Sequence, residues 1–340
     1  MSVRRAYLDT CPGERRGVVA LDGRPERLWI ERDGAPAGPR LGARYRARVS
    51  ELSPDRRLAF LDLGGGEAGA SAIRPDAAPA RGAMREAEVV AEQRAGKAAS
   101  LRLFGACEGT PGLIAEGPDL QARLTAAAPG GVHGGADARE IADAAEEAVL
   151  ADRFELEGGL TLSIEPTRAL TAVDVDWAGE AGVARRRAAG ANLVAIDETA
   201  RLVRLKGLGG TLVIDLVGFP GGDDALRQRA RQAFAPDGQG VTVLPVSRLG
   251  LLQVARPHRE RPIAELLLGP DGALSARSHA QRLVRALERE GRADPGARLV
   301  VACAPEVAEA LAPLATQLGP RYGVKAELGW ALAKADIQRT

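Results

Sequence analysis

The sequence predicts a multidomain α/β protein with a small β-barrel near the N-terminus, a mixed α/β core and a small α/β C-terminal domain. With 340 residues, the chain is long enough for two or three domains with their own cores. Five short alternating segments between residues 41 and 103 are typical of a small barrel. After residue 157, strand-like and helix-like segments alternate, as expected for a mixed α/β domain.

The first half of the chain is predicted to be rich in strands. Residues 14–33 alternate like a β-hairpin with its turn at 21–24, and 34–39 (GAPAGP) reads as a linker. The predicted barrel strands are 43–52, 58–63, 68–73, 87–93 and 100–103, and three glycines at 64–66 break the series. From 104 to 156 we expect a strand at 112–115, helices at 118–127 and 138–150, and an exposed Gly-rich loop around His133.

The second half alternates between strands and helices. Helices are predicted at 192–205 and 225–234, and a flexible loop at 179–190 precedes the first of them. After a turn at 269–272 (GPDG), the expected elements are a helix at 276–290, a strand at 298–304, a helix at 306–318 and a strand at 323–328.

Composition restricts the class of protein. A hydrophobic content of 45% and a charged content of 27% are those of an ordinary soluble protein. No apolar run approaches the ~18 residues of a membrane span, and the N-terminus lacks the apolar core of a signal peptide. We therefore expect a cytoplasmic protein, and the scattered Cys11, Cys107 and Cys303 fit a reducing compartment. A net charge of +1 is no general nucleic-acid signal, so any such surface must be local.

Aspartates interrupt two apolar, strand-like runs, 169–177 (ALTAVDVDW) and 209–217 (GGTLVIDLV). A carboxylate in a buried strand loses solvation worth several kcal/mol unless it is paired. Alternation places Asp174 and Asp176 on one face, and Asp215 joins them if its strand lies alongside. Such a cluster favours magnesium, with manganese also possible, because hard cations prefer carboxylate oxygens. The alternative is that each aspartate only ends a strand or caps a turn.

Three stretches in the same region resemble the ribonuclease E/G family. Residues 157–174 (EGGLTLSIEPTRALTAVD) resemble its first catalytic strand pair, and 192–210 (NLVAIDETARLVRLKGLGG) its helix leading into the second catalytic strand. Residues 246–254 (VSRLGLLQV) resemble a further signature. The resemblance extends to the predicted barrel, where 57–64 (RLAFLDLG) is similar to the family's S-one-type OB barrel.

The resemblance also implies a division of the chain into domains. Residues 1–38 would be the N-terminal hairpin of a reduced ribonuclease-H-like subdomain, and 104–156 its remainder. An OB-fold RNA-binding domain would occupy 39–103, a catalytic α/β nuclease subdomain 157–268, and a small domain 269–340.

Relatives have a 5′-monophosphate sensor pocket in a longer insert after the barrel, and no stretch here resembles it. They often carry Cys-Pro-x-Cys before the last domain, joining two subunits through a shared zinc ion. No cysteine lies there, so we expect no zinc and no zinc-linked dimer; other homo-oligomers stay open.

The activity implied by the resemblance is magnesium-dependent cleavage of single-stranded RNA, in RNA processing or decay. Asp174 and Asp215 would ligate the metal, and the products would carry 5′-phosphate and 3′-hydroxyl ends. Asp176 stands where the family has an asparagine that contacts the scissile phosphate. A carboxylate there repels phosphate unless it too binds metal.

The predicted RNA-binding residues come from both domains. Phe60 would be a stacking platform, since OB barrels stack bases on aromatics within a basic groove; the alternative is that Phe60 fills the barrel core. Ala70 stands where the family has a second aromatic, which predicts weaker stacking. The cationic or polar residues expected to flank Phe60 are Tyr45, Arg46, Arg48 and Lys97.

Two further arginines are candidates for phosphate contacts. Arg186 belongs to a basic segment at 185–187, for which a solvated surface loop is the alternative. Arg248 follows Ser247, and its alternative role is an ion pair to the aspartate cluster.

Two other functions remain open from the sequence. One is a non-catalytic RNA-binding relative that acts as an accessory factor in RNA processing. The other is a magnesium nuclease for single-stranded DNA, because contacts to a 2′-hydroxyl cannot be read from the sequence.

Overall fold

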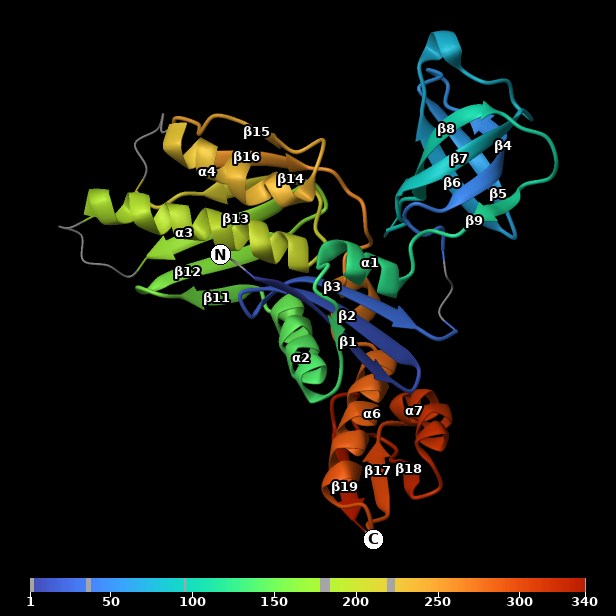
Figure 1. The fold of residues 1–340 in the computed structure, drawn as a ribbon, viewed down its shortest axis with the longest axis vertical. Coiled ribbons are helices and arrows are strands. Elements are labelled where there is room, and N and C mark those ends of the chain that lie inside the picture. The colour runs from blue at the N-terminus through green and yellow to red at the C-terminus, as the bar shows by residue number, and fades with distance from the viewer. Residues whose placement is uncertain (1–2, 35–37, 95, 178–183, 219–223, 340) are drawn as a thin grey trace.

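The computed structural model describes residues 3–34, 38–94, 96–177, 184–218 and 224–339. The described residues form four sheets, and a small central sheet lies between the other three (Figure 1). The barrel forms one lobe, a six-stranded sheet with its helices forms a second, and the C-terminal unit forms a third.

The central sheet is built on the predicted hairpin. Its order is β10-β1-β2-β3, and Asp22 (φ 51°) and Gly23 (φ 80°) make the tight turn. His133 is exposed, but it lies in a short strand paired with β1 rather than in a loop. Helices α1 and α2 pack on this sheet. The elements are β1 (Arg4–Cys11), β2 (Glu14–Leu21), β3 (Arg24–Arg32), α1 (Leu120–Ala127), β10 (Val132–His133) and α2 (Ala136–Leu150).

The predicted small barrel is confirmed as a closed five-stranded barrel. The sheet order β5-β6-β8-β7-β4 closes through the pairing of β5 with β4. A further strand, β9, pairs with β4, so the barrel sheet extends beyond the expected end of this region at residue 103. The elements are β4 (Arg44–Leu52), β5 (Leu58–Gly64), β6 (Glu67–Ala72), the 3-10 helix η1 (Pro75–Ala77), β7 (Met84–Ala91), β8 (Ala99–Ala106) and β9 (Gly112–Ala115).

The six-stranded sheet has the order β11-β12-β13-β14-β16-β15. It is mixed, as expected, because β13 and β14 are parallel whereas the other neighbours are antiparallel. Inward side chains such as Leu162, Val173 and Ile214 pack with Ile196 of α3 in one apolar cluster. The elements are β11 (Arg153–Leu156), β12 (Leu160–Pro166), β13 (Thr171–Trp177), α3 (Ala184–Leu205), β14 (Gly210–Asp215), α4 (Asp224–Phe234), η2 (Ala235–Asp237), β15 (Thr242–Val243) and β16 (Leu251–Arg256).

The C-terminal unit has the predicted helices and strands and one more strand. β17 lies between β18, which is parallel to it, and β19, which is antiparallel. Sequence alternation did not predict β19. Among the described helices we find none whose length and apolar character would let it span a bilayer. The elements are α5 (Ala264–Leu267), α6 (Ala276–Ala293), β17 (Leu299–Cys303), α7 (Pro305–Leu318), β18 (Tyr322–Ala326) and β19 (Ala335–Arg339).

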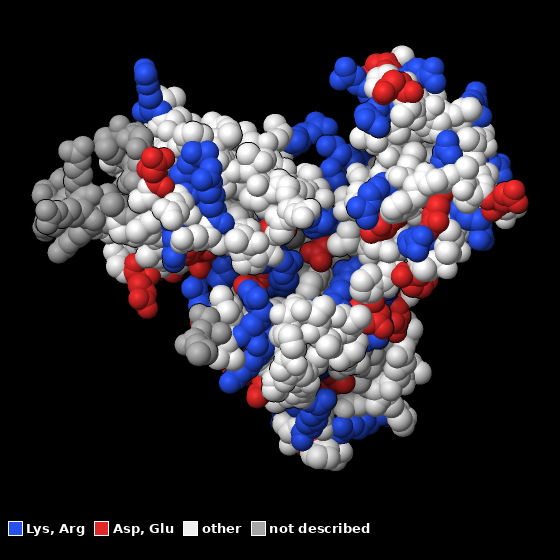
Figure 2. Space-filling model, turned by 45° about the horizontal axis from the view of Figure 1, so that its top comes forward, with Lys and Arg blue, Asp and Glu red and all other residues white. Residues whose placement is uncertain are grey.

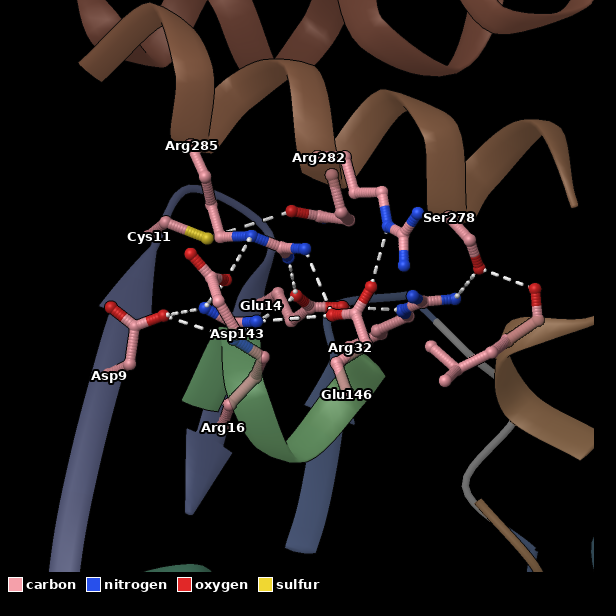
Figure 3. Close-up of polar contacts among 12 residues, drawn as sticks. Asp9, Cys11, Glu14, Arg16, Arg32, Asp143, Glu146, Ser278, Arg282 and Arg285 are labelled. Atoms are coloured by element: carbon pink, nitrogen blue, oxygen red, sulfur yellow. Dashed lines mark hydrogen bonds and ion pairs between the residues drawn. The ribbon is translucent and has the colours of Figure 1, made fainter. Parts of the chain in front are cut away.

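A buried network of charges joins α6 to the central sheet and α2 (Figure 3). The Arg16 side chain is fully buried and lies 2.6 Å from a carboxylate oxygen of Asp9 and 3.1 Å from one of Glu146. From α6, Arg285 reaches Glu14 at 2.6 Å and Glu146 at 2.9 Å. Because every one of these charges has an opposite partner, the network can be buried where a lone charge could not.

Candidate functional site

Asp174 and Asp215 lie directly opposite each other on neighbouring parallel strands. The register of β13 and β14 pairs Thr171 with Leu212 and Asp174 with Asp215, which is the last residue of β14. The strand that carries Asp215 therefore lies beside the strand that carries Asp174, as the predicted cluster requires. Side chains at paired positions point to the same face of a sheet.

That face is open rather than buried, which corrects the expectation of carboxylates in buried strands. Val173 and Val175 are buried against the helices, whereas Asp174, Asp176 and Asp215 are exposed. The aspartates are therefore largely solvated, and burial does not require a charged partner for them. Asp174 and Asp176 share the face, as the alternation predicted.

Negative charge accumulates at this point of the sheet. Partial burial, together with the charges of Asp176, Asp215 and Glu165, raises the pKa of Asp174 above its ordinary value. Glu165 was not among the candidates from the sequence. It lies on β12 two residues after Ser163, which pairs with Asp174, so alternation places Glu165 on the same face as Asp174. A concentration of carboxylates that repel one another favours binding of a cation.

The pair of Asp174 and Asp215 fits a magnesium site that has few protein ligands. No group of three or more His, Cys, Asp or Glu side chains arranged to hold a metal occurs in the part of the chain that the structure describes. Magnesium usually keeps several waters and takes one or two carboxylates together with substrate phosphates. Asp174 and Asp215 can supply those two carboxylates.

A buried asparagine that the sequence analysis missed holds the chain beyond Asp215. The Asn192 side chain is 1% exposed, accepts a hydrogen bond from the Val217 N–H (3.0 Å) and donates one to the Val217 carbonyl (3.1 Å). Both backbone groups of a residue just past the strand are thereby fixed by α3. The sequence signal that could have indicated this role is a polar asparagine at the start of the predicted apolar helix at 192–205.

Arg248 lies in an exposed turn close to the aspartates. Hydrogen bonds from Gly250 N–H to the Ser247 carbonyl (3.0 Å) and from Leu251 N–H to the Ser247 hydroxyl (3.1 Å) close the turn. Leu251 pairs directly with Asp215, so the turn begins β16 beside it. Among the described residues Arg248 forms no ion pair, so the alternative of a structural ion pair to the aspartates is wrong.

The basic segment at 185–187 belongs to a helix and not to a loop. α3 begins at Ala184, so the predicted loop at 179–190 is wrong over its second half. Residues 178–183 and the Arg186 side chain lie outside the described residues. The proposed contact of Arg186 with RNA stays a prediction.

Comparison with known proteins identifies the same region. Residues 136–259, which include all three aspartates, Asn192 and Arg248, match the model of the ribonuclease E/G family. The chain resembles the ribonuclease E/G family.

The similar proteins are much longer than the matched segments. Ribonuclease E of Escherichia coli strain K12 is 32% identical over 123 residues, which are 35% of this chain and 12% of that protein. Ribonuclease G of the same strain is 28% identical over 170 residues, 47% of this chain and 35% of that protein. The chloroplastic ribonuclease E/G-like protein of Arabidopsis thaliana is 29% identical over 148 residues, 42% and 14% of the two chains.

Phe60, predicted from the ribonuclease E/G resemblance as a stacking platform, is on the barrel surface. Its side chain is 40% exposed, so the alternative that it fills the core is wrong. Ala70 lies directly opposite Phe60 on β6. These paired positions could hold two aromatic rings side by side, but here only Phe60 is aromatic.

The residues expected to flank Phe60 divide into different environments. Tyr45 is buried in the barrel core, which corrects the expectation that it faces the groove. Arg46 is half-buried and donates to the Thr110 carbonyl (3.1 Å), whereas Arg48 is exposed. In Figure 2 basic and acidic side chains are interspersed over the visible face.

Lys97 lies at the junction between the barrel and the six-stranded sheet. It is exposed in the loop between β7 and β8. Burial of the ring and the positive charges of Arg94 and Lys97 lower the pKa of His258 to about 4. The loop is also tied to the sheet by a 2.7 Å bond from the Glu92 N–H to the Arg259 carbonyl.

The glycines before the second aspartate strand have a packing role at the same junction. A Cβ added to Gly209 would lie 2.8 Å from the Cα of His258. The glycine therefore lets the chain after β16 lie against the start of β14.

Proposed function

We propose that this chain is an endoribonuclease that cleaves single-stranded RNA with magnesium held by Asp174 and Asp215. The observation that carries the proposal is the pairing of these two carboxylates across β13 and β14, on the open face of the sheet. The pair lies within the segment that matches the ribonuclease E/G family.

The chain's own residues supply the framework for phosphodiester hydrolysis. Asp174 and Asp215 form the negative centre, Asn192 fixes the backbone beyond Asp215, and the exposed Arg248 can contact a phosphate. Bound magnesium would lower the pKa of a water for in-line attack and stabilise charge on the phosphate. The expected products carry 5′-phosphate and 3′-hydroxyl ends.

The barrel would hold the RNA strand as an OB-fold domain. Phe60 offers an exposed ring on which a base can stack, and Arg48 and Lys97 offer exposed positive charge. The central sheet with α1 and α2 would be a reduced ribonuclease-H-like subdomain, and the last domain would not be joined to another by zinc.

The test is cleavage of a labelled A/U-rich single-stranded RNA by wild type and by Asp174→Asn and Asp215→Asn. We expect loss of at least roughly a hundredfold in rate in either variant, and no cleavage with a chelator. Glu155→Gln, on the open face of the same sheet but on β11, is the matched control and should cleave like wild type. Cleavage that persists in both aspartate variants would refute the proposed metal site. Faster cleavage of a DNA strand of the same sequence would show that the substrate is single-stranded DNA rather than RNA.

A non-catalytic RNA-binding relative is the second candidate, and two observations favour it. Asp176 adds a third exposed carboxylate where phosphate should approach, and Ala70 leaves Phe60 without an aromatic neighbour. RNA binding without cleavage, unchanged by Asp174→Asn and Asp215→Asn, would support this candidate.

A further inference from the structure

A cavity at one end of the barrel combines positive charge with an exposed aromatic ring. It has a volume of about 560 Å³ and lies between the end of β6, the start of β7 and the second half of β8. Arg74, Arg85, Arg102 and Phe104 line it, and its floor includes buried Pro79. None of its described lining residues is acidic.

The arginines of this cavity are largely uncompensated. Arg102 is paired with Glu88 at 2.6 Å. Arg74 and Arg85 form no ion pair with any described residue. By contrast, in the cavity between the barrel and the central sheet, Arg40 is paired with Glu31 at 3.1 Å and Arg123 with Glu92 at 3.2 Å.

Phe104 gives the cavity a surface for stacking. Its ring is 43% exposed, and the Arg102 guanidinium lies over it, 5.3 Å from the ring centroid. An exposed phenylalanine beside a planar guanidinium is a platform on which a base can stack, and neighbouring arginines suit the phosphate.

The cavity continues the surface that carries Phe60. Phe60 is opposite Ala70 on β6, and Ala70 is opposite Ser100 on β8. Ala72 follows Ala70 by two residues on β6, and Arg102 follows Ser100 by two residues on β8, so both lie on the same outer face. Both residues line the cavity. With a rise of about 3.3 Å per residue, the cavity begins roughly 7 Å beyond the Phe60 row.

We propose that the cavity of Arg74, Arg85, Arg102 and Phe104 is a second nucleotide subsite of the barrel for single-stranded RNA. Phe104 stacks a base, and Arg74 and Arg85 hold the adjoining phosphate. This inference rests on the proposed function for its ligand and adds a site that compensates for the alanine opposite Phe60. A strand that crosses Phe60 and enters the cavity uses both platforms.

The test is binding without cleavage. A fluorescent, uncleavable 2′-O-methyl A/U-rich strand of about 12 nucleotides is titrated in EDTA at several salt concentrations. Arg74→Gln with Arg85→Gln should weaken binding roughly tenfold or more and lower the salt slope by about 1.4. Phe104→Ala should weaken binding roughly 5- to 100-fold with the salt slope unchanged, since stacking releases no counterions.

The matched control is Arg81→Gln, which removes an exposed barrel arginine outside the cavity. It should change affinity by less than about twofold. Equal losses in Arg81→Gln and in the cavity variants, or no loss in Phe104→Ala, would overturn the proposal.

A second measurement on wild type does not depend on the folding of variants. A strand containing 4-thiouridine should crosslink to the β8 segment with Phe104 as well as to the β5 segment with Phe60. Crosslinks to β5 without β8 would overturn the subsite.

The outcome also separates this inference from the proposed function. Cleavage by wild type, with binding unaffected by the cavity variants, would overturn the subsite and leave the nuclease. Binding lost in the cavity variants, with no cleavage by wild type in magnesium, would support the subsite and overturn the nuclease.

Discussion

Asn192 holds both the N–H and the carbonyl of Val217, two residues beyond Asp215, with hydrogen bonds of 3.0 and 3.1 Å. A buried side chain of α3 thereby holds the chain just beyond the strand that carries the second candidate ligand. Asn192→Ala leaves two partly buried backbone groups of Val217 without their partner, at a cost of about 2 kcal/mol. We expect cleavage to fall roughly tenfold or more even where the variant remains folded.

Thermal unfolding and RNA cleavage measured on the same preparation check this prediction. Val194→Ala, a half-exposed position on the same helix, is the control and should alter neither. A variant that is destabilised but fully active would show that Asn192 serves stability alone.

Asp176→Asn tests the third carboxylate. If Asp176 only repels the phosphate, the neutral amide should raise the cleavage rate roughly 3- to 10-fold. Manganese binding, followed by electron paramagnetic resonance, should stay unchanged. A fall in both rate and manganese affinity would instead make Asp176 a third metal ligand.

Ala70→Phe should strengthen RNA binding by placing a second ring opposite Phe60. Base–aromatic stacking is worth about 1–3 kcal/mol per base, so affinity should rise roughly 5-fold or more. Fluorescence anisotropy with an uncleavable strand measures it. Ala72→Phe, on the same strand, would block the cavity and should weaken binding if the second subsite is correct.

Acid should weaken the attachment of α6 to the central sheet. Burial alone would raise the pKa of Glu146, but Arg285, Arg282 and Arg16 outweigh it and hold the pKa below its ordinary value. A carboxylate with a lowered folded pKa stabilises the fold above its unfolded pKa. That contribution is lost as pH falls from about 5 towards the folded pKa.

Chemical denaturation of wild type, Glu146→Gln and Glu147→Gln between pH 7 and pH 4 measures this contribution. Glu146→Gln should lose about 3 kcal/mol at pH 7 and show a shallower decline with acid. The exposed neighbour Glu147 is the matched control and should behave like wild type. Identical acid profiles for all three proteins would contradict the role of the network.

Cleavage should not depend on the 5′ end of the RNA. In the sequence analysis we recognised no stretch that resembles the family's 5′-monophosphate sensor, and the prediction rests on that expectation. Oligonucleotides with a 5′-triphosphate and a 5′-monophosphate should therefore be cleaved at rates within about twofold of each other. A strong preference for the monophosphate would reveal a sensor formed elsewhere in the chain.

The amino-acid sequence by itself determined most elements and the positions of the candidate aspartates. Alternation is a local property, so the hairpin, the five barrel strands and the shared face of Asp174 and Asp176 could be read from it. The family motifs at 157–174, 192–210 and 246–254 are local in the same sense. Short strands with little alternation, such as β10 and β19, depend on their neighbours and were not predicted.

Only the tertiary structure decided which side chains meet and which faces are covered. The opposition of Asp174 to Asp215 depends on register between strands far apart in the chain, and their exposure depends on α3 and α4 covering the other face. The burial of Tyr45 and the exposure of Phe60 follow from the closure of the barrel. Asn192 and the cavity around Phe104 join residues distant in sequence, and no local pattern encodes such contacts.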